Sequence, residues 1–191
     1  MRRYTPVWVM ACVLTGMLLQ IEIDGYFLAD YRNATRLLME EERERTAIAT
    51  VFSGRNLGLA PTEALVMAFA VQAYSRERGL DPGLVTAVIL VESDAKPDAV
   101  SPAGARGLMQ VMPRTAKDTP HPCPLPQGER DLREALFVID TNICIGTHIL
   151  ADNISRWGYR EGIQRYFWGS GNVPDNAYLV KVLDAMEGLD G

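Results

Sequence analysis

The chain has 191 residues, of which 48% are hydrophobic and 23% are charged. This length and composition are typical of one folded domain with a short appendage, and they exclude an intrinsically disordered or collagen-like chain. The 19 basic and 24 acidic residues give a formal net charge of −5, which argues against nucleic acid as a partner, while three widely spaced cysteines and two histidines argue against a metal site.

The first predicted element is an N-terminal membrane helix. The uncharged stretch Tyr4–Ile21 would reach roughly 27 Å as a helix, which just spans a bilayer core. Two arginines precede it and acidic residues follow it, so the positive-inside bias places the rest of the chain outside the cytoplasm. We find no convincing cleavage site between Thr15 and Ala29, which favours an uncleaved anchor over a cleaved signal peptide and leaves a buried core helix as a third interpretation.

These features predict an inner-membrane-anchored protein with its domain in the periplasm, or a protein secreted to the periplasm. Residues 1–27 are the predicted signal anchor or signal peptide. Residues 28–60 follow as a stalk or packing helix with a solvated, charged face and a glycine-containing connector. Residues 61–191 are predicted to form the functional domain.

Within this domain the signals are helical, and no alternating strand pattern stands out. Proline and glycine punctuate a helix over Pro61–Arg78, and Asp81-Pro82 begins an uncharged helix that ends near Glu92. The segment Gly107–Lys117 predicts one or two short helices, the second beginning at Pro113. Four prolines predict that Thr119–Gly128 is an exposed loop outside the core. Further helical spacing occurs in Asp131–Ile154, Tyr159–Trp168 and Asp175–Glu187.

Cys123 and Cys144 are candidates for a disulfide, because the predicted location is an oxidising compartment. The bond would close a loop of about 20 residues and stabilise the fold by roughly 3 kcal/mol in the chain-entropy model. Two separate thiols are the alternative, because sequence gives no geometry.

Glu92 is the first candidate for a catalytic residue. It follows the uncharged run Leu84–Val91, a pattern typical of a helix buried on every side. Its carboxyl group would be partly desolvated and would face the negative end of the helix dipole, and both effects raise the pKa of a carboxyl group. A general acid near neutral pH requires such a shift. The alternative is a glutamate that turns into water where the helix ends.

A second catalytic carboxylate is not evident, although glycoside cleavage commonly uses two. Asp94 lies two positions after Glu92, which on a helix turns it to nearly the opposite face, and Asp98 lies in the loop beyond. If the reaction is glycosidic, the second role would therefore fall to the substrate itself.

Residues 91–116 read VESDAKPDAVSPAGARGLMQVMPRTA. This segment resembles the signature of the family 1 lytic transglycosylases, the soluble-lytic-transglycosylase-like domain. The residues that match the family at its spacing are Glu92, Ser93, Pro97, Ala99, Ser101, Gly104, Gly107, Leu108, Met109, Gln110, Met112, Pro113, Thr115 and Ala116. Two later segments are also similar to the family, namely Asn142-Ile143 with Gly146 and Leu150, and Tyr166 with Gly169, Gly171, Asn172 and Val173. The likeness covers roughly residues 62–187.

The resemblance implies a mainly α, lysozyme-like domain of the goose-type or lytic transglycosylase kind that acts on peptidoglycan glycan strands. It would cleave the β-1,4 bond between N-acetylmuramic acid and N-acetylglucosamine. Glu92 would protonate the leaving oxygen and then act as base on the muramic 6-hydroxyl, which closes a 1,6-anhydro ring without water. The muramic N-acetyl group would assist from within the substrate, and no metal or organic cofactor is required.

By the same resemblance, Ser101, Gln110 and Met112 would line the glycan groove, and Tyr166 would lie close to Glu92. Met112 could instead fill the core, because methionine readily occupies gaps. Ser93 could touch the substrate or serve as a structural hydrogen-bond donor at the helix end.

One position departs from the family pattern. Where the family has Ala-Tyr-Asn-Ala-Gly, this chain reads Arg165-Tyr166-Phe167-Trp168-Gly169, so phenylalanine replaces the asparagine. The loss of this polar group bears on rate or substrate preference. Phe167 and Trp168 could stack on a sugar, although aromatic neighbours at a helix end more often belong to the core.

Three functions remain open at this point. The first is a membrane-anchored or exported lytic transglycosylase. The second is a weakly active or inactive wall-binding subunit that works with the proteins of an envelope-spanning assembly. The third is a lysozyme-type hydrolase on the same fold.

Overall fold

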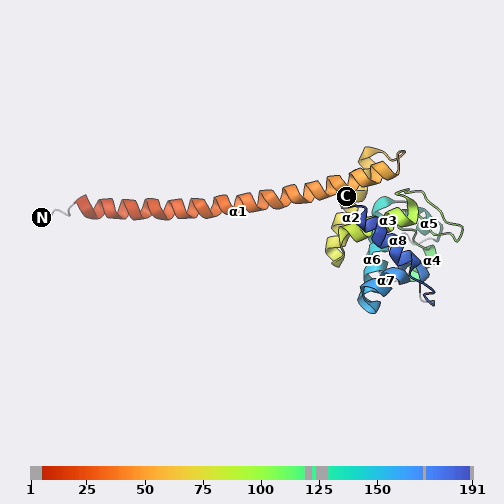
Figure 1. The fold of residues 1–191 in the computed structure, drawn as a ribbon. Helices are drawn as coiled ribbons and strands as arrows, with labels where there is room; N and C mark the ends of the chain where they lie inside the picture. Colours follow the sequence, from red (N-terminus) through yellow and green to blue (C-terminus); the bar gives the residue numbers. More distant parts are fainter. Residues whose placement is uncertain (1–5, 119–121, 124–128, 170, 190–191) are drawn as a thin grey trace. The chain divides into compact units, whose positions relative to one another are not determined.

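The computed structural model describes residues 6–118, 122–123, 129–169 and 171–189. It contains α1 (Pro6–Arg55), α2 (Pro61–Arg78), α3 (Pro82–Ser93), α4 (Pro113–Asp118), α5 (Glu129–Ala135), α6 (Ile139–Trp157), α7 (Tyr159–Trp168) and α8 (Ala177–Glu187) (Figure 1). In these residues β structure is confined to isolated bridges, so the predicted mainly α class is confirmed. The chain divides into two compact units, Met1–Glu44 and Arg45–Gly191.

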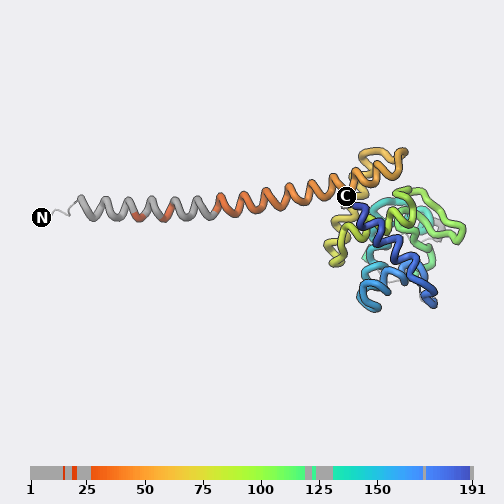
Figure 2. The backbone as a smooth tube through the Cα atoms, viewed as in Figure 1, coloured from red at the N-terminus to blue at the C-terminus, as the bar shows by residue number. Residues whose placement is uncertain are grey.

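The first unit consists of the N-terminal part of α1. From residue 27 onward the trace of α1 is an unbroken helical tube (Figure 2). Large apolar side chains are exposed along it, namely Phe27, Leu28, Tyr31, Leu37, Leu38 and Met39. Among the described residues, no helix is both long enough and apolar enough to cross a membrane. Most of the side chains of Tyr4–Ile21 lie outside the described residues, so the membrane anchor stays a prediction.

The second unit is built around α3, whose residues 84–90 are all buried. The uncharged run therefore forms a central helix, as its sequence predicts. The helix begins where the Asp81 carboxylate accepts a hydrogen bond of 2.7 Å from the Gly83 N–H, and α8 packs along it. The last turns of α1 contribute Ile48, Ala49 and Phe52 to the same core. These contacts hold the C-terminal end of α3 at a fixed place in the domain.

The segment Gly107–Lys117 differs from its prediction in one respect. The helix α4 begins at Pro113 as expected, but no helix precedes it. Residues 100–111 form a loop in which Arg106 bridges to both Val100 and Val111. The backbone of Gly107 (φ 73°) and Gln110 (φ 47°) has left-handed torsions that interrupt a helix.

The side chain of Asn142 in α6 fixes this loop from outside it. Its Nδ2 donates to the carbonyls of Arg106 (2.9 Å) and Leu136 (2.8 Å), and its Oδ1 accepts from the Met109 N–H (2.8 Å). The predicted continuous helical stretch Asp131–Ile154 is accordingly divided into α5 and α6. A residue distant in sequence thus fixes the conformation of the loop, so the local sequence could not predict that conformation.

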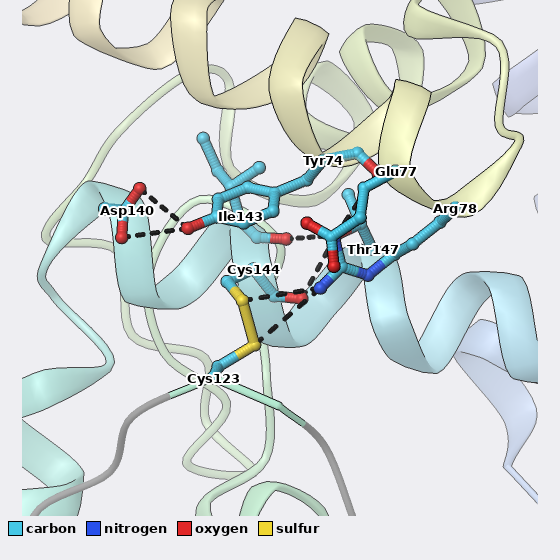
Figure 3. The surroundings of a disulfide bond; sticks show 8 residues. All are labelled: Tyr74, Glu77, Arg78, Cys123, Asp140, Ile143, Cys144 and Thr147. Atoms are coloured by element: carbon cyan, nitrogen blue, oxygen red, sulfur yellow. Dashed lines mark hydrogen bonds and ion pairs between the residues drawn. A yellow bond between two sulfur atoms is a disulfide. The ribbon is translucent and has the colours of Figure 1, made fainter.

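Cys123 and Cys144 form a disulfide, which excludes the alternative of two separate thiols (Figure 3). Cys123 is buried in the core, so the prediction that Thr119–Gly128 lies entirely outside the core is wrong at this residue. The bond to α6 draws the cysteine inward. The other residues of that loop, apart from the exposed Pro122, lie outside the described residues.

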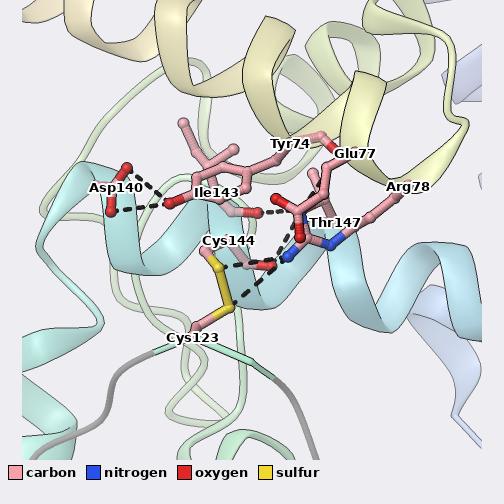
Figure 4. Close-up of polar contacts among 8 residues, drawn as sticks. All are labelled: Tyr74, Glu77, Arg78, Cys123, Asp140, Ile143, Cys144 and Thr147. Atoms are coloured by element: carbon pink, nitrogen blue, oxygen red, sulfur yellow. Dashed lines mark hydrogen bonds and ion pairs between the residues drawn. A yellow bond between two sulfur atoms is a disulfide. The ribbon is translucent and has the colours of Figure 1, made fainter.

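Arg78 joins α2 to this disulfide and so to α6 (Figure 4). Its side chain is only 7% exposed, and its Nη2 donates to Cys144 Sγ at 3.5 Å. The guanidinium lies over the ring of Tyr74, 4.8 Å from the centroid, and the Tyr74 hydroxyl donates to Asp140 of α6 at 2.9 Å. Burial, reinforced by Asp140, raises the pKa of Tyr74 to about 12, so this hydroxyl stays a neutral donor. These contacts of Tyr74 and Arg78 hold α6, which carries Asn142, against α2.

Candidate active site

Glu92 lies in the last turn of α3, partly exposed, with a tyrosine on its carboxyl group. The hydroxyl of Tyr178, in the first turn of α8, donates to Glu92 Oε1 at 2.7 Å. Burial raises the pKa of Glu92 from its ordinary value of 4.5, and the hydrogen bond from Tyr178 opposes that rise. Desolvation is the larger effect, so the carboxyl group retains its proton to higher pH than an exposed glutamate does.

Tyr166 of α7 shares this environment. Its hydroxyl donates to the carbonyl of Met109 at 2.8 Å, which connects α7 to the loop before α4. Burial, with a smaller contribution from the charge of Glu92, raises the pKa of Tyr166 well above its ordinary value. Burial, then the charge of Glu92 and the hydrogen bond to it, raise the pKa of Tyr178 well above its ordinary value. Two neutral tyrosines therefore face one carboxyl group that resists ionisation.

The two nearby aspartates have surroundings different from those of Glu92. Asp94 caps α3 in a left-handed conformation (φ 53°) and pairs with Arg55 of α1 at 2.8 Å. Asp98 is exposed in the loop beyond. Within the described residues, no cluster of three or more His, Cys, Asp or Glu side chains could hold a metal ion.

The predicted groove residues in the loop after α3 have different environments. Ser101 Oγ accepts from the Ala105 N–H at 3.0 Å and so closes a turn. The Gln110 Nε2 donates to the carbonyls of Ala99 (3.2 Å) and Gly107 (2.9 Å). Both side chains thus make hydrogen bonds that shape the loop. Met112 is 38% exposed, so the interpretation that it fills the core is wrong.

Ser93, next to Glu92, is buried and donates to the carbonyl of Ile89 at 3.1 Å. This is the structural role that was one of its two interpretations. Gly107 has a separate requirement, because a Cβ atom there would collide with the carbonyl of Leu136 and the side chain of Asn142. The loop that carries the groove candidates therefore depends on a glycine at this position.

A cavity of about 650 Å³ opens between α4, α6 and α7. Its lining includes Met112, Arg156, Trp157, Tyr166, Phe167 and Trp168. Met112 also borders a second cavity of about 420 Å³ beside Gly104 and Arg133. Two predicted substrate-binding residues, Met112 and Tyr166, thus share one aromatic-walled cavity.

The structure places Phe167 and Trp168 on the surface, with 54% and 38% of their residue area exposed. The interpretation of both as core residues is therefore wrong, and the reason is that the end of α7 borders the cavity. The ring of Phe167 stacks on Tyr178, with centroids 4.8 Å apart and planes 17° from parallel.

Tyr178 is the site residue that sequence reasoning missed. It stands in the apolar pattern of Asp175–Glu187, where a tyrosine fits an amphipathic helix and suggests no chemistry. Only the folded arrangement, in which α8 packs on both α3 and α7, brings it to Glu92 (Figure 1).

A family model described as the transglycosylase SLT domain matches residues 69–179. A transglycosylase of Enterobacteria phage PRD1 is 30% identical over 129 residues, which are 63% of this chain and 44% of that protein. Membrane-bound lytic murein transglycosylase C of Actinobacillus pleuropneumoniae is 41% identical over 119 residues, which are 60% of this chain and 32% of that protein. The chain thus spans less than half the length of these relatives.

Among solved structures, an inactive mutant of the lytic transglycosylase Slt from Pseudomonas aeruginosa matches 63% of this chain and 21% of its own, with 24% identity and a TM-score of 0.46. The family match and the names of the relatives confirm the resemblance inferred from the motifs. Because the match covers more than half of the chain, the protein belongs to the transglycosylase SLT domain family.

Proposed function

We propose that the protein is a peptidoglycan lytic transglycosylase that leaves 1,6-anhydromuramic ends. The observation that carries the proposal is Glu92, whose carboxyl group is desolvated at the end of a buried helix and accepts a hydrogen bond from Tyr178. A proton donor of this kind is what cleavage of a glycosidic bond requires. The mainly helical domain also fits the lysozyme-like fold that the resemblance implies.

In the proposed reaction, protonated Glu92 gives its proton to the oxygen that leaves from C1 of the muramic residue. The resulting carboxylate then takes the proton of the muramic 6-hydroxyl while that oxygen bonds to C1. The Tyr178 hydroxyl donates to one carboxyl oxygen, which leaves the other oxygen to exchange the proton. Tyr178 would stabilise the intermediate carboxylate, because a hydrogen bond to a charged group is stronger than one to a neutral group.

We propose further that the glycan strand passes along the cavity lined by Met112 and Tyr166. Aromatic walls of this kind suit the apolar faces of sugar rings. Ser101 and Gln110 stay predicted groove residues. Their hydrogen bonds to the surrounding loop would hold it in the shape that presents Met112.

The proposed location is the periplasm, with residues 1–27 as a signal anchor or signal peptide. The Cys123–Cys144 disulfide supports an oxidising compartment, and relatives are named membrane-bound murein transglycosylases. Protease added to intact spheroplasts of the expressing bacterium should degrade the domain. Protection of the domain until the membrane is lysed would contradict this orientation.

Phe167, which replaces the family asparagine, keeps a second candidate open, a weakly active wall-binding subunit. Digestion of purified sacculi and mass spectrometry of the released muropeptides separates the candidates. The proposal predicts anhydro ends from the native chain and none from a folded Glu92→Gln variant, with a loss of at least about 100-fold. Hydrated reducing ends would indicate a hydrolase, and intact sacculi with retained binding would indicate the wall-binding subunit.

A further inference from the structure

Phe167, the residue that departs from the family pattern, lies directly on Tyr178, the hydrogen-bond partner of Glu92. Phe167 is the penultimate residue of α7 and Tyr178 is the second residue of α8, and their rings stack face to face at 4.8 Å. Tyr178 is 4% exposed, whereas Phe167 is 54% exposed. Phe167 therefore covers Tyr178 while part of its own surface borders the cavity described above.

We propose that Phe167 is a positioning residue, which by stacking on Tyr178 keeps the Tyr178 hydroxyl on Oε1 of Glu92. This inference rests on the proposed function and adds a residue to it. It gives the phenylalanine a role that asparagine, the residue expected at this position, could not fill, because asparagine has no ring to stack.

The contacts around the stack support this role. The hydroxyl of Tyr178 reaches Glu92 at 2.7 Å, and a hydrogen bond of this length depends strongly on the direction of its donor. Rotation about χ1 of Tyr178 would carry the ring and its hydroxyl away from Glu92, whereas rotation about χ2 leaves the hydroxyl oxygen on the ring axis. The parallel ring of Phe167 occupies one face of Tyr178 and so opposes the χ1 movement. Trp168 also contacts Phe167, with the two rings edge-on and their centroids 5.0 Å apart.

The role is geometric and does not require a charge on Phe167 or on its neighbours. The titratable groups that face Glu92 are Tyr178 from α8 and Tyr166 from α7. Burial raises the pKa of both tyrosines well above the ordinary value, so both remain neutral hydroxyls at physiological pH. What Phe167 controls is the direction from which a neutral hydroxyl approaches the carboxyl group.

A double-mutant cycle on the full chain tests the proposal, with release of muropeptides from sacculi as the assay. Phe167→Ala should lower kcat about fivefold in the native background, the order expected for loss of one stacked aromatic pair. In a Tyr178→Phe background, which keeps the ring and removes the hydroxyl, the same change should lower kcat by less than about twofold. Phe167→Tyr, which can still stack, should restore the native rate.

The matched control is Phe69→Ala, which removes a similarly exposed ring of α2 that packs against Arg45, and it should leave kcat unchanged. An equal loss of kcat in both backgrounds would overturn the proposal, since Phe167 would then act without the hydroxyl. A rise in KM with unchanged kcat would also overturn it, because that result would mean direct stacking on the sugar.

A second measurement does not depend on activity, so it separates this inference from the proposed function. The ¹³Cζ resonance of Tyr178 should respond as Glu92 titrates, with Glu92→Gln as the assignment control. The response should be lost in Phe167→Ala and retained in Phe167→Tyr and Phe69→Ala. An unchanged response in Phe167→Ala would overturn the positioning role, even if the native chain released no muropeptides and the proposed function failed.

Discussion

At the scale of single residues, the protein holds a carboxyl group at the end of a buried helix under two opposing influences. Burial raises the pKa of Glu92, and the hydrogen bond from Tyr178 lowers it. A fully buried carboxyl group would be too weak an acid, and a fully solvated one would ionise below neutral pH. The pKa of Glu92 thus depends on Tyr178 as well as on burial, so substitution of either residue tests this explanation.

Removal of the Tyr178 hydroxyl should raise the pKa of Glu92, because only the hydrogen bond that lowers it is lost. In the proposed reaction Glu92 must be protonated for the first proton transfer, so activity should fall as pH rises through its pKa. In Tyr178→Phe the basic limb of the kcat/KM profile should therefore move to higher pH. Tyr166→Phe is the control, since that hydroxyl donates to Met109 and should leave the limb in place. A shift of the Tyr178→Phe limb to lower pH would refute the assignment.

The ionised carboxyl group of Glu92 should also destabilise the folded protein at neutral pH. Its pKa is raised in the folded state, so the stability gained by protonation is fully present below the ordinary value of 4.5 and is lost as pH rises through the folded-state pKa. Glu92→Gln should therefore unfold at a higher urea concentration than the native chain at pH 8, and the two should converge near pH 4. Equal midpoints at both pH values would show that the carboxyl group is not desolvated.

Among single residues, the sequence predicted a functional role where a charged side chain follows directly on an apolar run. Glu92 ends a run of apolar residues, so both its charge and its place at the core edge could be inferred. Tyr178 has no such local sign, because its importance comes from a helix that packs on α3 from the other end of the chain. Gln110 matched a motif, but its bonds to two loop carbonyls could not be inferred from the sequence.

At the scale of elements, prediction succeeded where the helix ends carry their own signals. The bounds of α2 and α3 follow from prolines at their first positions, from Gly79 in a left-handed conformation and from the Asp81 cap. The loop before α4 has no such signals. Asn142, which is distant in sequence, fixes this loop by hydrogen bonds to the backbone of Arg106 and Met109. The helix expected after Gly107 therefore does not form.

Gly107→Ala should measure how far this loop depends on close packing. The change strains a backbone with φ of 73° and drives a Cβ atom into Leu136 and Asn142. The matched control is Gly104→Ala, where φ is 90° and the space beside the residue is open. Gly104→Ala should lose about 1–2 kcal/mol of unfolding free energy from backbone strain alone.

Gly107→Ala should lose about 2 kcal/mol more than this control, because the collision adds to the strain. Urea denaturation followed by circular dichroism measures both variants. Equal losses would show that the contact between Gly107 and Asn142 does not fix the loop.

At the scale of the whole molecule, the division into two units predicts where the chain can be cut. Residues 45–191 include Ile48, Ala49 and Phe52 of α1, which are buried in the second unit. A chain that begins at residue 45 should therefore keep the unfolding free energy of this unit. A chain that begins at residue 57 should lose about 3–5 kcal/mol, as expected for removal of a buried aromatic ring. Equal urea midpoints for the two chains would contradict this view of the core.

The central claim is that Glu92 transfers protons between the two sugars and that water takes no part. The most direct measurement is digestion of purified sacculi by the full chain in water enriched in ¹⁸O, with mass spectrometry of the new glycan ends. The account predicts anhydromuramic ends that carry no heavy oxygen, and no new ends from the folded Glu92→Gln variant. Incorporation of one heavy oxygen at each new reducing end, or unchanged cleavage by Glu92→Gln, would contradict it.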